Sequence, residues 1–471
     1  MPQLLHAFLE CDQMLMHGMT LAVPAIPLFL LFFGVQSRTH KAPSSAVLRL
    51  ASERAHAGMS RMLHTSDWHV GHTLHGYPRT DDFEAVFAEI VDIARESKPD
   101  LIVHTGDLFH TSSPTGLSLF SATEVLRQLA DVAPTVVVAG NHDSPTYFRF
   151  LDMVNGPSVG RGLYFVDRFR TVEEGGVFTF DACGGEQRIR LAAMPFVHPN
   201  RFWRRPALST SNADYAEGLR GLQQQLVDAM REGYDPDRDV LFFAAHVYVT
   251  GATRSESERQ VDESFEVAPE NLPQVSYTAL GHIHRPQAVR GPAFPACYAG
   301  SPLAMDFGEA GEQKSVVIVD ADPGRPGRPL PRSLHAARRL DIFEGTLDEL
   351  RADAARYDGT FLRAVISGEE PDVRLAQKIA EIVPQAIAIK PRLDLKPAAD
   401  ILVNVDPGKE LELPDAFRAY LGQEGVTGAA ADDTVAAFIK LLNEVDDETP
   451  SPVLAEQLLG AALEDVWSEK P

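Results

Sequence analysis

The sequence contains few cysteines, and this limits both its redox environment and its metal chemistry. Its 471 residues include only Cys11, Cys183 and Cys297. They form neither an even set nor a CxxC pair, which argues against a disulfide framework and against zinc held by thiolates. The composition is otherwise ordinary for a globular protein, with 44% hydrophobic and 23% charged residues. We therefore expect a protein of the reducing cytoplasm.

A long hydrophobic run is also missing. The most apolar stretch, residues 19–35, has 17 residues and includes Pro24 and Pro27, whereas a spanning helix needs about 20 apolar residues. No Lys or Arg precedes it, which argues against a signal peptide. A membrane anchor is thus the lesser alternative, and no membrane association is expected. Because Met59 and Met62 directly precede the first predicted strand, we expect residues 1–58 to be an extension that is either untranslated or disordered.

Basic residues are scarce. Lys and Arg number 43 against 66 Asp and Glu, a formal net charge of -23, and residues 408–471 hold 14 acidic and 4 basic residues. Proteins that bind nucleic acid through its phosphates need Lys and Arg. The chain alone is therefore not a strongly basic DNA clamp, so metal ions or a partner subunit must supply most of the phosphate binding.

What the sequence does contain is a series of short polar clusters, each directly after a predicted strand. Nearly all of their side chains offer oxygen or nitrogen to a divalent metal. Strands of an open α/β sheet bring their carboxyl ends to one edge, so clusters far apart in the chain can meet there. The clusters are Asp67-Trp68-His69, Gly106-Asp107, Gly140-Asn141-His142-Asp143, His246 and Gly281-His282-Ile283-His284.

Hydrophobic periodicity predicts an α/β protein. Strands at 62–65, 101–104 and 135–139 alternate with helices at 81–97 and 117–130, which indicates βαβ units with right-handed crossovers. Further predicted elements follow: strands at 163–166, 177–180, 189–193, 240–245, 277–280, 296–299 and 315–320, and a helix at 215–231. We expect a two-sheet sandwich flanked by helices.

Composition divides the chain into five predicted segments. After the extension comes a main domain at 59–322. A Pro/Gly/Arg-rich linker follows at 323–338, then a small α/β module at 339–407 and an acidic helical tail at 408–471. The tail has amphipathic stretches at 415–421, 433–445 and 453–466. No internal repeat is present.

The residue types suit hydrolysis of a phosphodiester. Two divalent ions roughly 3.5 to 4 Å apart can stabilise charge on both the attacking and the leaving oxygen. Such a pair needs a bridging carboxylate and a mixed set of imidazole, carboxylate and amide ligands, which suits Mn or Fe better than calcium. Asp107, alone at a strand end after Gly106, is the candidate bridge. Asp67 and His69 are two residues apart, so both can reach one metal.

The remaining clusters complete the predicted ligand set. His282 and His284 have the same spacing and can divide between the two metals. Asn141 offers an amide oxygen and His246 an imidazole. We expect His142, next to a ligand, to face the substrate, where it would protonate the leaving oxygen or stabilise transition-state charge.

Four neighbours of these clusters are predicted to be structural. His64 and His104 precede their motifs inside strands, so we interpret them as packed or hydrogen-bonded residues. Trp68, between two predicted ligands, should pack beneath them. We expect Asp143 to stabilise its turn, which is the more common role of the residue that follows the histidine in such a loop.

The ordered set DxH, GD, GNHD, H, GHxH resembles the calcineurin-like metallophosphoesterase superfamily. Within it, six segments are similar to the SbcD nucleases, bacterial relatives of the double-strand-break repair nuclease of eukaryotes and archaea. The similarity covers residues 62–320, more loosely the tail, and does not extend to the N-terminal extension. The segments are HTSDWHVG, HTGDLFH, AGNHDSP, AHVYVTG, LGHIHRPQ and YAGSP.

This resemblance implies specific roles for the clusters. His142 would be the catalytic histidine and His110 would help to orient the DNA backbone. The cofactors would be two divalent ions, Mn²⁺ by preference. The implied ligands are Asp67, His69, Asp107 and His284 for metal one, and Asp107, Asn141, His246 and His282 for metal two.

The resemblance also implies an activity and partners. The expected activity is 3′-to-5′ exonuclease action on duplex ends and endonuclease action on single strands or hairpins, in DNA repair and recombination. A homodimer would work with an SbcC-type coiled-coil ATPase in a heterotetramer. The module at 339–407 would then cap the DNA, and the acidic tail would dock on the ATPase.

Two alternatives remain open. One is another metallophosphoesterase, a protein phosphatase or a small-molecule phosphodiesterase. Phosphatases usually place arginines in the second and third motifs, whereas this chain has Leu108, Phe109 and His110 in one and Asp143 and Ser144 in the other. The second alternative is a non-catalytic scaffold for DNA ends that keeps its metals for structure.

Overall fold

The computed structural model describes residues 58–393 apart from gaps at 161, 172, 199–211, 256–257, 259–265 and 369–373, and isolated residues between 417 and 438. The predicted N-terminal extension, apart from Gly58, and most of the acidic tail lie outside this part of the chain. No helix in the described part is both long and apolar enough to cross a membrane.

The first six-stranded sheet has the order β16-β15-β1-β4-β5-β6. Strands β1, β4, β5 and β6 run parallel, and β15 and β16 add an antiparallel edge. The bounds are β1 (Ser60–Thr65), β4 (Leu101–His104), β5 (Thr135–Val138), β6 (Leu163–Val166), β15 (Ser315–Ala321) and β16 (Arg328–Ser333).

The second sheet has the order β13-β14-β12-β9-β8-β7, with β14, β12, β9 and β8 parallel. Its bounds are β7 (Val177–Ala182), β8 (Gln187–Met194), β9 (Asp239–His246), β12 (Tyr277–Gly281), β13 (Gln287–Ala288) and β14 (Ala296–Tyr298). Two small ladders pair β2 (Thr73–Leu74) with β3 (Tyr77–Pro78), and β10 (Tyr248–Val249) with β11 (Glu266–Val267).

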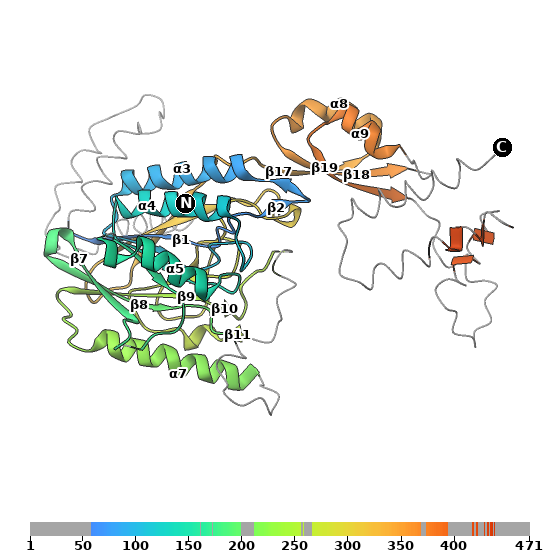
Figure 1. Cartoon of the computed structure of the whole chain (residues 1–471). Helices are drawn as coiled ribbons and strands as arrows, with labels where there is room; N and C mark the ends of the chain where they lie inside the picture. Colours follow the sequence, from blue (N-terminus) through green and yellow to red (C-terminus); the bar gives the residue numbers. More distant parts are fainter. Residues whose placement is uncertain are drawn as a thin grey trace, which may run out of the picture. The chain divides into compact units, whose positions relative to one another are not determined.

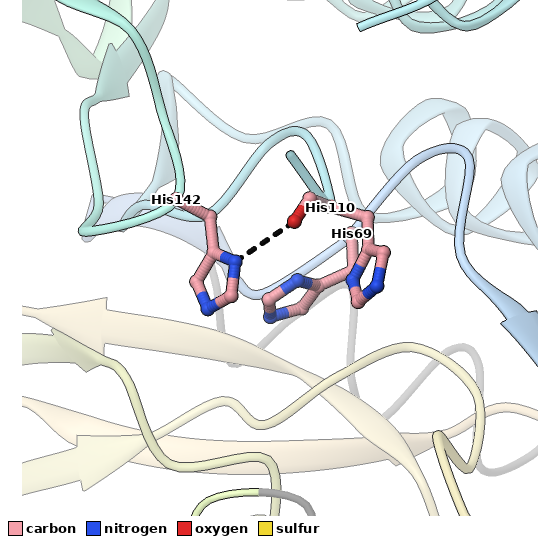
Figure 2. Close-up of side chains that lie close together, drawn as sticks. All are labelled: His69, His110 and His142. Carbon is pink, nitrogen blue, oxygen red and sulfur yellow. Dashed lines mark hydrogen bonds between the residues drawn. The ribbon is translucent and has the colours of Figure 1, made fainter. Parts of the chain in front are cut away.

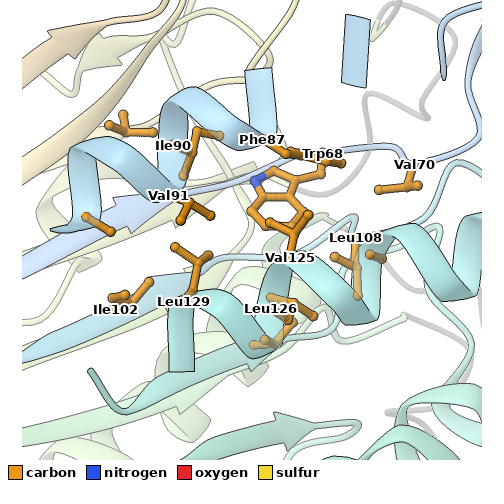
Figure 3. Close-up of a cluster of buried hydrophobic side chains, with 14 of the residues drawn as sticks. Trp68, Val70, Phe87, Ile90, Val91, Ile102, Leu108, Val125, Leu126 and Leu129 are labelled. Atoms are coloured by element: carbon orange, nitrogen blue, oxygen red, sulfur yellow. The ribbon is translucent and has the colours of Figure 1, made fainter. Parts of the chain in front are cut away.

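Strict alternation along the strands builds three apolar layers, because successive side chains of a strand point to opposite faces. In β9, Val240 and Phe242 enter the core between the two sheets, while Leu241 and Phe243 face outward toward α7 (Asn212–Arg231). In β4, Ile102 packs outward into the layer that contains Trp68 (Figure 3). The central strands are thus buried on both faces, which explains their continuous apolar sequences.

Three helices cover the first sheet, and α7 lies on the side of the second (Figure 1). They are α3 (Thr80–Ser97), α4 (Gly116–Ala130) and α5 (Pro145–Asn155). Thr115 caps α4, since its hydroxyl accepts from the Ser118 backbone N–H. The two-sheet α/β sandwich predicted from periodicity is confirmed.

The short strands β2, β3, β10, β11 and β13 were not predicted, and two longer elements also differ from the predictions. Helix α5 was not predicted. Within the predicted linker, residues 328–333 form β16, which pairs with β15. Pro329 and Pro331 are tolerated there because, among the described strands, β16 pairs on one side only, and an edge strand can lack ladder donors.

The module after β16 has the order strand, helix, strand, helix, strand, and is α/β as predicted. Its parallel sheet β17-β18-β19 carries two helices over its own core. Thr346 and Glu349 form a reciprocal capping box at the first helix. The bounds are β17 (Leu340–Gly345), α8 (Leu347–Asp353), β18 (Phe361–Gly368), α9 (Leu375–Ile382) and β19 (Ala386–Leu393). The domain boundaries themselves stay a prediction.

Candidate metal centre

All seven predicted metal ligands converge at the carboxyl ends of strands from both sheets. On the first sheet, β1, β4 and β5 lead to Asp67, Asp107 and Asn141. On the second sheet, β9 ends at His246, and β12 leads to His282 and His284. Residues more than 200 positions apart in the sequence therefore meet in one place.

The first group of convergent side chains is Asp67, His69 and His284. Their ligand atoms all lie within 4.8 Å of one another, and all three residues are buried. The Nε2 atoms of His69 and His284 face each other 3.1 Å apart. Asp67 also accepts from the His282 backbone N–H at 3.0 Å, which ties this group to the next loop.

The second group is Asp107, His246 and His282, again with ligand atoms within 4.8 Å. Asn141 joins it: its Oδ1 lies 2.9 Å from His246 Nε2 and 3.0 Å from His282 Nδ1. These two nitrogens are 3.3 Å apart. Three donor atoms at such spacings form a triangle that one cation of ordinary bond length, about 2.1 Å to nitrogen or oxygen, can face.

Asp107 stands between the two groups. Its Oδ2 lies 3.5 Å from His69 Nε2 in the first group and 3.5 Å from His246 Nε2 in the second. Its other oxygen accepts from the His142 backbone N–H at 2.8 Å. One carboxylate oxygen is therefore equidistant from nitrogen ligands of both groups, as a bridge requires.

The backbone is strained where the ligands are. Positive φ angles, which non-glycine residues rarely adopt, occur at Asp67 (50°), His69 (47°), Asp107 (54°) and His282 (102°). Such conformations persist only where the surroundings enforce them, and they concentrate at functional sites. Here the unfavourable backbone conformations let the loops direct the proposed ligand side chains toward a common point.

Two glycines let the loops approach closely. A Cβ at Gly140 would collide with the Asp107 carboxylate and backbone, and a Cβ at Gly281 would collide with the Thr105 carbonyl and the Ser66 hydroxyl. These two positions in the motifs therefore require glycine, because no room remains for a side chain beside the proposed ligands.

Burial and the attraction between opposite charges shift the pKa values of the carboxylates and histidines in both ligand groups. Burial raises the pKa of Asp67 to about 7, against the pull of His246 and His284. Burial also opposes ionisation of Asp107, but His246 and other histidines hold its pKa well below the usual range. In turn, although burial lowers histidine pKa values, Asp107 raises the pKa of His246 to about 9, and Glu309 raises that of His284 to about 9.

The directions of these pKa shifts indicate whether the site suits a cation. The buried carboxylates hold protons, and so positive charge, on His246 and His284, whereas burial lowers the pKa of His282 to about 3 and that of His69 well below its usual value. A divalent cation supplies that charge and binds neutral imidazole, carboxylate and amide oxygen, which are the groups present. In addition, the Nδ1 of the buried His69 has no hydrogen-bond partner among the described residues. The residues therefore fit a pair of divalent metals.

His142 lies beside His69, one of the predicted ligands (Figure 2). Its Nδ1 donates to the His110 carbonyl at 2.8 Å, which leaves Nε2 without a proton of its own in the neutral ring. The His142 ring centroid is 4.8 Å from that of His69 and 5.9 Å from that of His110. The three imidazoles offer ligand atoms within 4.8 Å of one another. His142 and His110 are both partly exposed, so they can meet a substrate.

The predicted structural residues have the expected roles. Buried His64 hydrogen-bonds Tyr277 and Thr105. Trp68 is buried in the outer layer and donates to the Thr65 hydroxyl. His104 packs edge-on against Trp68.

Asp143 is a brace and not a member of the ligand groups. Its carboxylate accepts from the backbone N–H groups of Gly140, Leu108 and Phe109 at 2.9 to 3.1 Å. It thereby fixes the second motif against the third, and the interpretation of Asp143 from the sequence is confirmed.

The acidic and basic side chains that contact His284 on the side away from the ligands were not predicted from the sequence. Glu258 accepts from the His284 backbone N–H, and Glu309 and Lys314 lie on its ring and carbonyl sides. They come from loops outside the motifs. A lone Glu or Lys in a loop has no sequence pattern that marks it as buried.

Residues 60–286 match the family model described as calcineurin-like phosphoesterase. The chain is 31% identical over 411 residues to a Bacillus subtilis protein, the SbcD component of the nuclease SbcCD, covering 82% of this chain and 99% of that protein. The protein of the same name from Escherichia coli K12 is 27% identical over 323 residues, which cover 63% of this chain and 74% of that protein. Among solved structures, a dimetal phosphatase from Danio rerio is similar over 59% of this chain and 99% of that chain, at 11% identity and a TM-score of 0.32.

Proposed function

Since the chain belongs to the SbcD-type nucleases, a family of calcineurin-like phosphoesterases, we propose that its metal centre hydrolyses DNA phosphodiesters with two divalent cations. The observation that carries this proposal is the position of Asp107 Oδ2, 3.5 Å from a histidine nitrogen of each ligand group. A structural site for one ion does not need a shared oxygen, whereas two-metal hydrolysis does.

We assign the ligands by group. The first cation belongs with Asp67, His69 and His284, and the second with Asn141, His246 and His282; Asp107 serves both. The mixture of carboxylate, amide and imidazole, with no thiolate, suits Mn²⁺ or Fe²⁺ better than Ca²⁺, and of these we propose Mn²⁺. When bound, such a pair supplies Lewis-acid stabilisation of the phosphoryl group and of its attacking and leaving oxygens.

The chain's own residues orient the substrate and handle its proton. His142 is held by the His110 carbonyl through Nδ1, so Nε2 points away from that anchor. A protonated Nε2 would donate to a phosphoryl or leaving oxygen in the transition state. His110 stacks nearly parallel to His142, with 16° between the planes, and is placed to contact the DNA backbone beside it.

We further propose that the chain works with an SbcC-type ATPase on DNA ends and hairpins, as a 3′-to-5′ exonuclease and a single-strand endonuclease. The relatives are named as components of SbcCD, and the net charge of -23 is a poor match for tight DNA binding by this chain alone. The acidic residues 408–471 are the proposed ATPase-docking segment.

An exposed apolar surface on α4 and α5 supports a homodimer. Leu117 and Phe120 of α4 are 65% and 69% exposed, and Phe150 and Met153 of α5 are also exposed. The helices are joined by a hydrogen bond from Arg127 to Asn155. Exposed large apolar side chains on these two helices offer a candidate interface, and in the proposed homodimer a second copy would cover them with two-fold symmetry.

The proposal is tested with the full chain, with and without its ATPase, on a hairpin and on a blunt duplex labelled at either end. We expect cleavage that depends on Mn²⁺ and stops with a chelator. A phosphomonoester and a cyclic nucleotide serve as comparison substrates. Hydrolysis of these two alone would replace the nuclease proposal with a phosphatase or small-molecule phosphodiesterase. Binding of two metals without any hydrolysis would favour a scaffold.

A further inference from the structure

A buried ion pair lies directly behind one of the proposed metal ligands. Glu309 is 0% exposed and Lys314 6% exposed, and Lys314 Nζ lies 2.6 Å from Glu309 Oε2. Burying two charges is expensive unless further hydrogen bonds compensate. Glu309 ends the short 3-10 helix η5 (Phe307–Glu309) and Lys314 directly precedes β15, so the pair lies outside the sheet strands and the packing of the sheet layers does not explain its burial.

The contacts of the pair converge on His284. Lys314 Nζ donates to the His284 carbonyl at 3.0 Å. Glu309 Oε1 lies 3.4 Å from His284 Nδ1. The backbone N–H of His284 is held by Glu258. The carbonyl, the amide and the ring of a single residue are thus each held by a charged side chain.

The orientation of the ring decides what it can bind. A neutral imidazole carries one proton, and a carboxylate facing Nδ1 keeps that proton on Nδ1. The lone pair of Nε2 can then coordinate a cation, and His284 Nε2 points at the first ligand group, 3.1 Å from His69 Nε2. Glu258 Oε1 also lies 3.6 Å from His284 Nδ1, but that oxygen already accepts from the His284 backbone N–H, so Glu309, the nearer carboxylate at 3.4 Å, is the main determinant of the form in which His284 faces a cation.

We propose that Glu309 is a positioning residue that sets the affinity of the first cation by holding His284 in its metal-binding tautomer, with Lys314 fixing the carboxylate. This inference rests on the proposed two-metal function. It concerns one cation of the two, since on the other side His246 Nδ1 donates to the uncharged Thr105 carbonyl at 2.8 Å.

Glu309→Gln gives a sharp test because it has nearly the same shape. The carboxylate accepts on both oxygens: Oε1 faces His284, while Oε2 accepts from Lys314 and from the Met305 backbone N–H at 3.1 Å. An amide has one acceptor oxygen. Lys314 Nζ and the Met305 backbone N–H both donate to it, so this oxygen stays on the Lys314 side. The amide NH₂ group then faces His284 Nδ1, which favours the proton on Nε2 and blocks the metal.

The matched control is Glu312→Gln. Glu312 belongs to the same loop and also contacts Lys314, with Oε2 3.4 Å from Nζ, but its other oxygen faces Arg285 and not His284. Its side chain is 15% exposed. Glu312→Gln therefore removes one negative charge near Lys314, as Glu309→Gln does, without altering a contact of a proposed metal ligand.

Manganese affinity is measured on the metal-free full-length protein by calorimetry and elemental analysis. We expect Glu309→Gln to weaken one of the two equivalents by about 10- to 100-fold, the range found for partners of metal-bound histidines, and Glu312→Gln to change neither by more than about twofold. Equal weakening of both equivalents, or wild-type affinity for both, would overturn the proposal.

Paramagnetic resonance supplies a readout that a general loss of stability does not produce. At two added equivalents of Mn²⁺ we expect a spin-coupled pair in the wild type, whereas Glu309→Gln should show isolated ions and should form the pair only at higher Mn²⁺ concentrations. In cleavage assays the Mn²⁺ concentration for half-maximal rate should rise by about tenfold, with the rate at saturation largely restored. A fall in saturated rate with unchanged metal dependence would contradict the inference.

Glu309→Asp keeps the test decisive if the glutamine variant does not fold. It retains the charge and both acceptors but draws them back by one methylene, and we expect a loss of about 3- to 10-fold for the same single equivalent, smaller than for glutamine. No loss would count against positioning by Glu309. If the wild type binds two metals but cuts no DNA, the proposed function fails while this metal assay still decides the role of Glu309.

Discussion

The two halves of the metal centre are built differently. Behind His284, in the first half, stand buried ions: Glu309, Lys314 and Glu258. Behind His246 and His282, in the second half, stand a backbone carbonyl and the ring of Phe196, which stacks on His282 at 16° between the planes.

The comparison teaches how one site can treat two equal cations unequally. An imidazole backed by a carboxylate is a stronger ligand than one backed by a carbonyl, but its strength depends on charges that must themselves be neutralised. The first half should therefore respond to charge substitutions, and the second half to changes of shape and packing.

The largest expected effect removes both halves together. Asp107→Ala takes away the oxygen that lies 3.5 Å from a nitrogen of each group, and we expect both metals and all cleavage to be lost. Elemental analysis of the purified variant measures this, with Asp92→Ala, an exposed position on α3, as the control. Retention of one metal equivalent would show that Asp107 is not shared.

The next effect separates the halves. His246→Ala should lose the second cation and His284→Ala the first, each weakening its own equivalent by more than about 100-fold, because a direct ligand matters more than its outer partner. Calorimetric titration with Mn²⁺ resolves the two steps. If either variant loses both metals, the halves are coupled more tightly than the ligand geometry indicates.

His142→Ala should leave both halves intact. Its ring is anchored on the His110 carbonyl and belongs to neither ligand group that contains Asp67 or Asp107. We expect the metal content to stay unchanged and the cleavage rate to fall by about 10²- to 10⁴-fold, as for loss of a general acid. His335→Ala, an exposed histidine outside the centre, is the control. Undiminished cleavage would remove His142 from the mechanism.

The smallest expected effect tests the shape dependence of the second half. A Cβ at Gly281 meets the Thr105 carbonyl and the Ser66 hydroxyl, so Gly281→Ala should reduce the free energy of unfolding by about 1 to 3 kcal/mol, the usual cost of overpacking. The control Gly221→Ala lies in α7, where a Cβ would meet none of the described atoms within 4 Å, and should add up to about 1 kcal/mol through helix propensity. Urea denaturation of the metal-free proteins measures both, and equal stabilities would contradict the close approach.

Periodicity predicted most of the sandwich because its strands are buried on both faces and its helices have one clear apolar stripe. It failed at α5, where Phe148 and Leu151 are buried but Phe150 and Met153 are exposed. At 11 residues α5 is at the lower length limit for recognising a helix from its periodicity. It also failed at β16, since Pro and Arg are typical of linkers and are equally suited to an edge strand.

The convergence of the proposed ligands was predictable because each follows a strand whose end must lie at the shared edge of a sheet. Asp107 could be selected as the bridge from its isolation after Gly106. Glu309 and Lys314 could not be selected, because their importance comes from burial in a loop, and burial of a charge is decided by tertiary contacts that no local pattern encodes.

The left-handed backbone at Asp67, His69 and Asp107 has a consequence for engineering. The coordination sphere cannot be transplanted as a list of side chains, because a recipient scaffold with relaxed loops would aim the same residues elsewhere. A graft would have to carry the contorted segments together with their glycine neighbours, and asparagine, which tolerates this conformation better than most residues, would be the gentlest replacement at either aspartate.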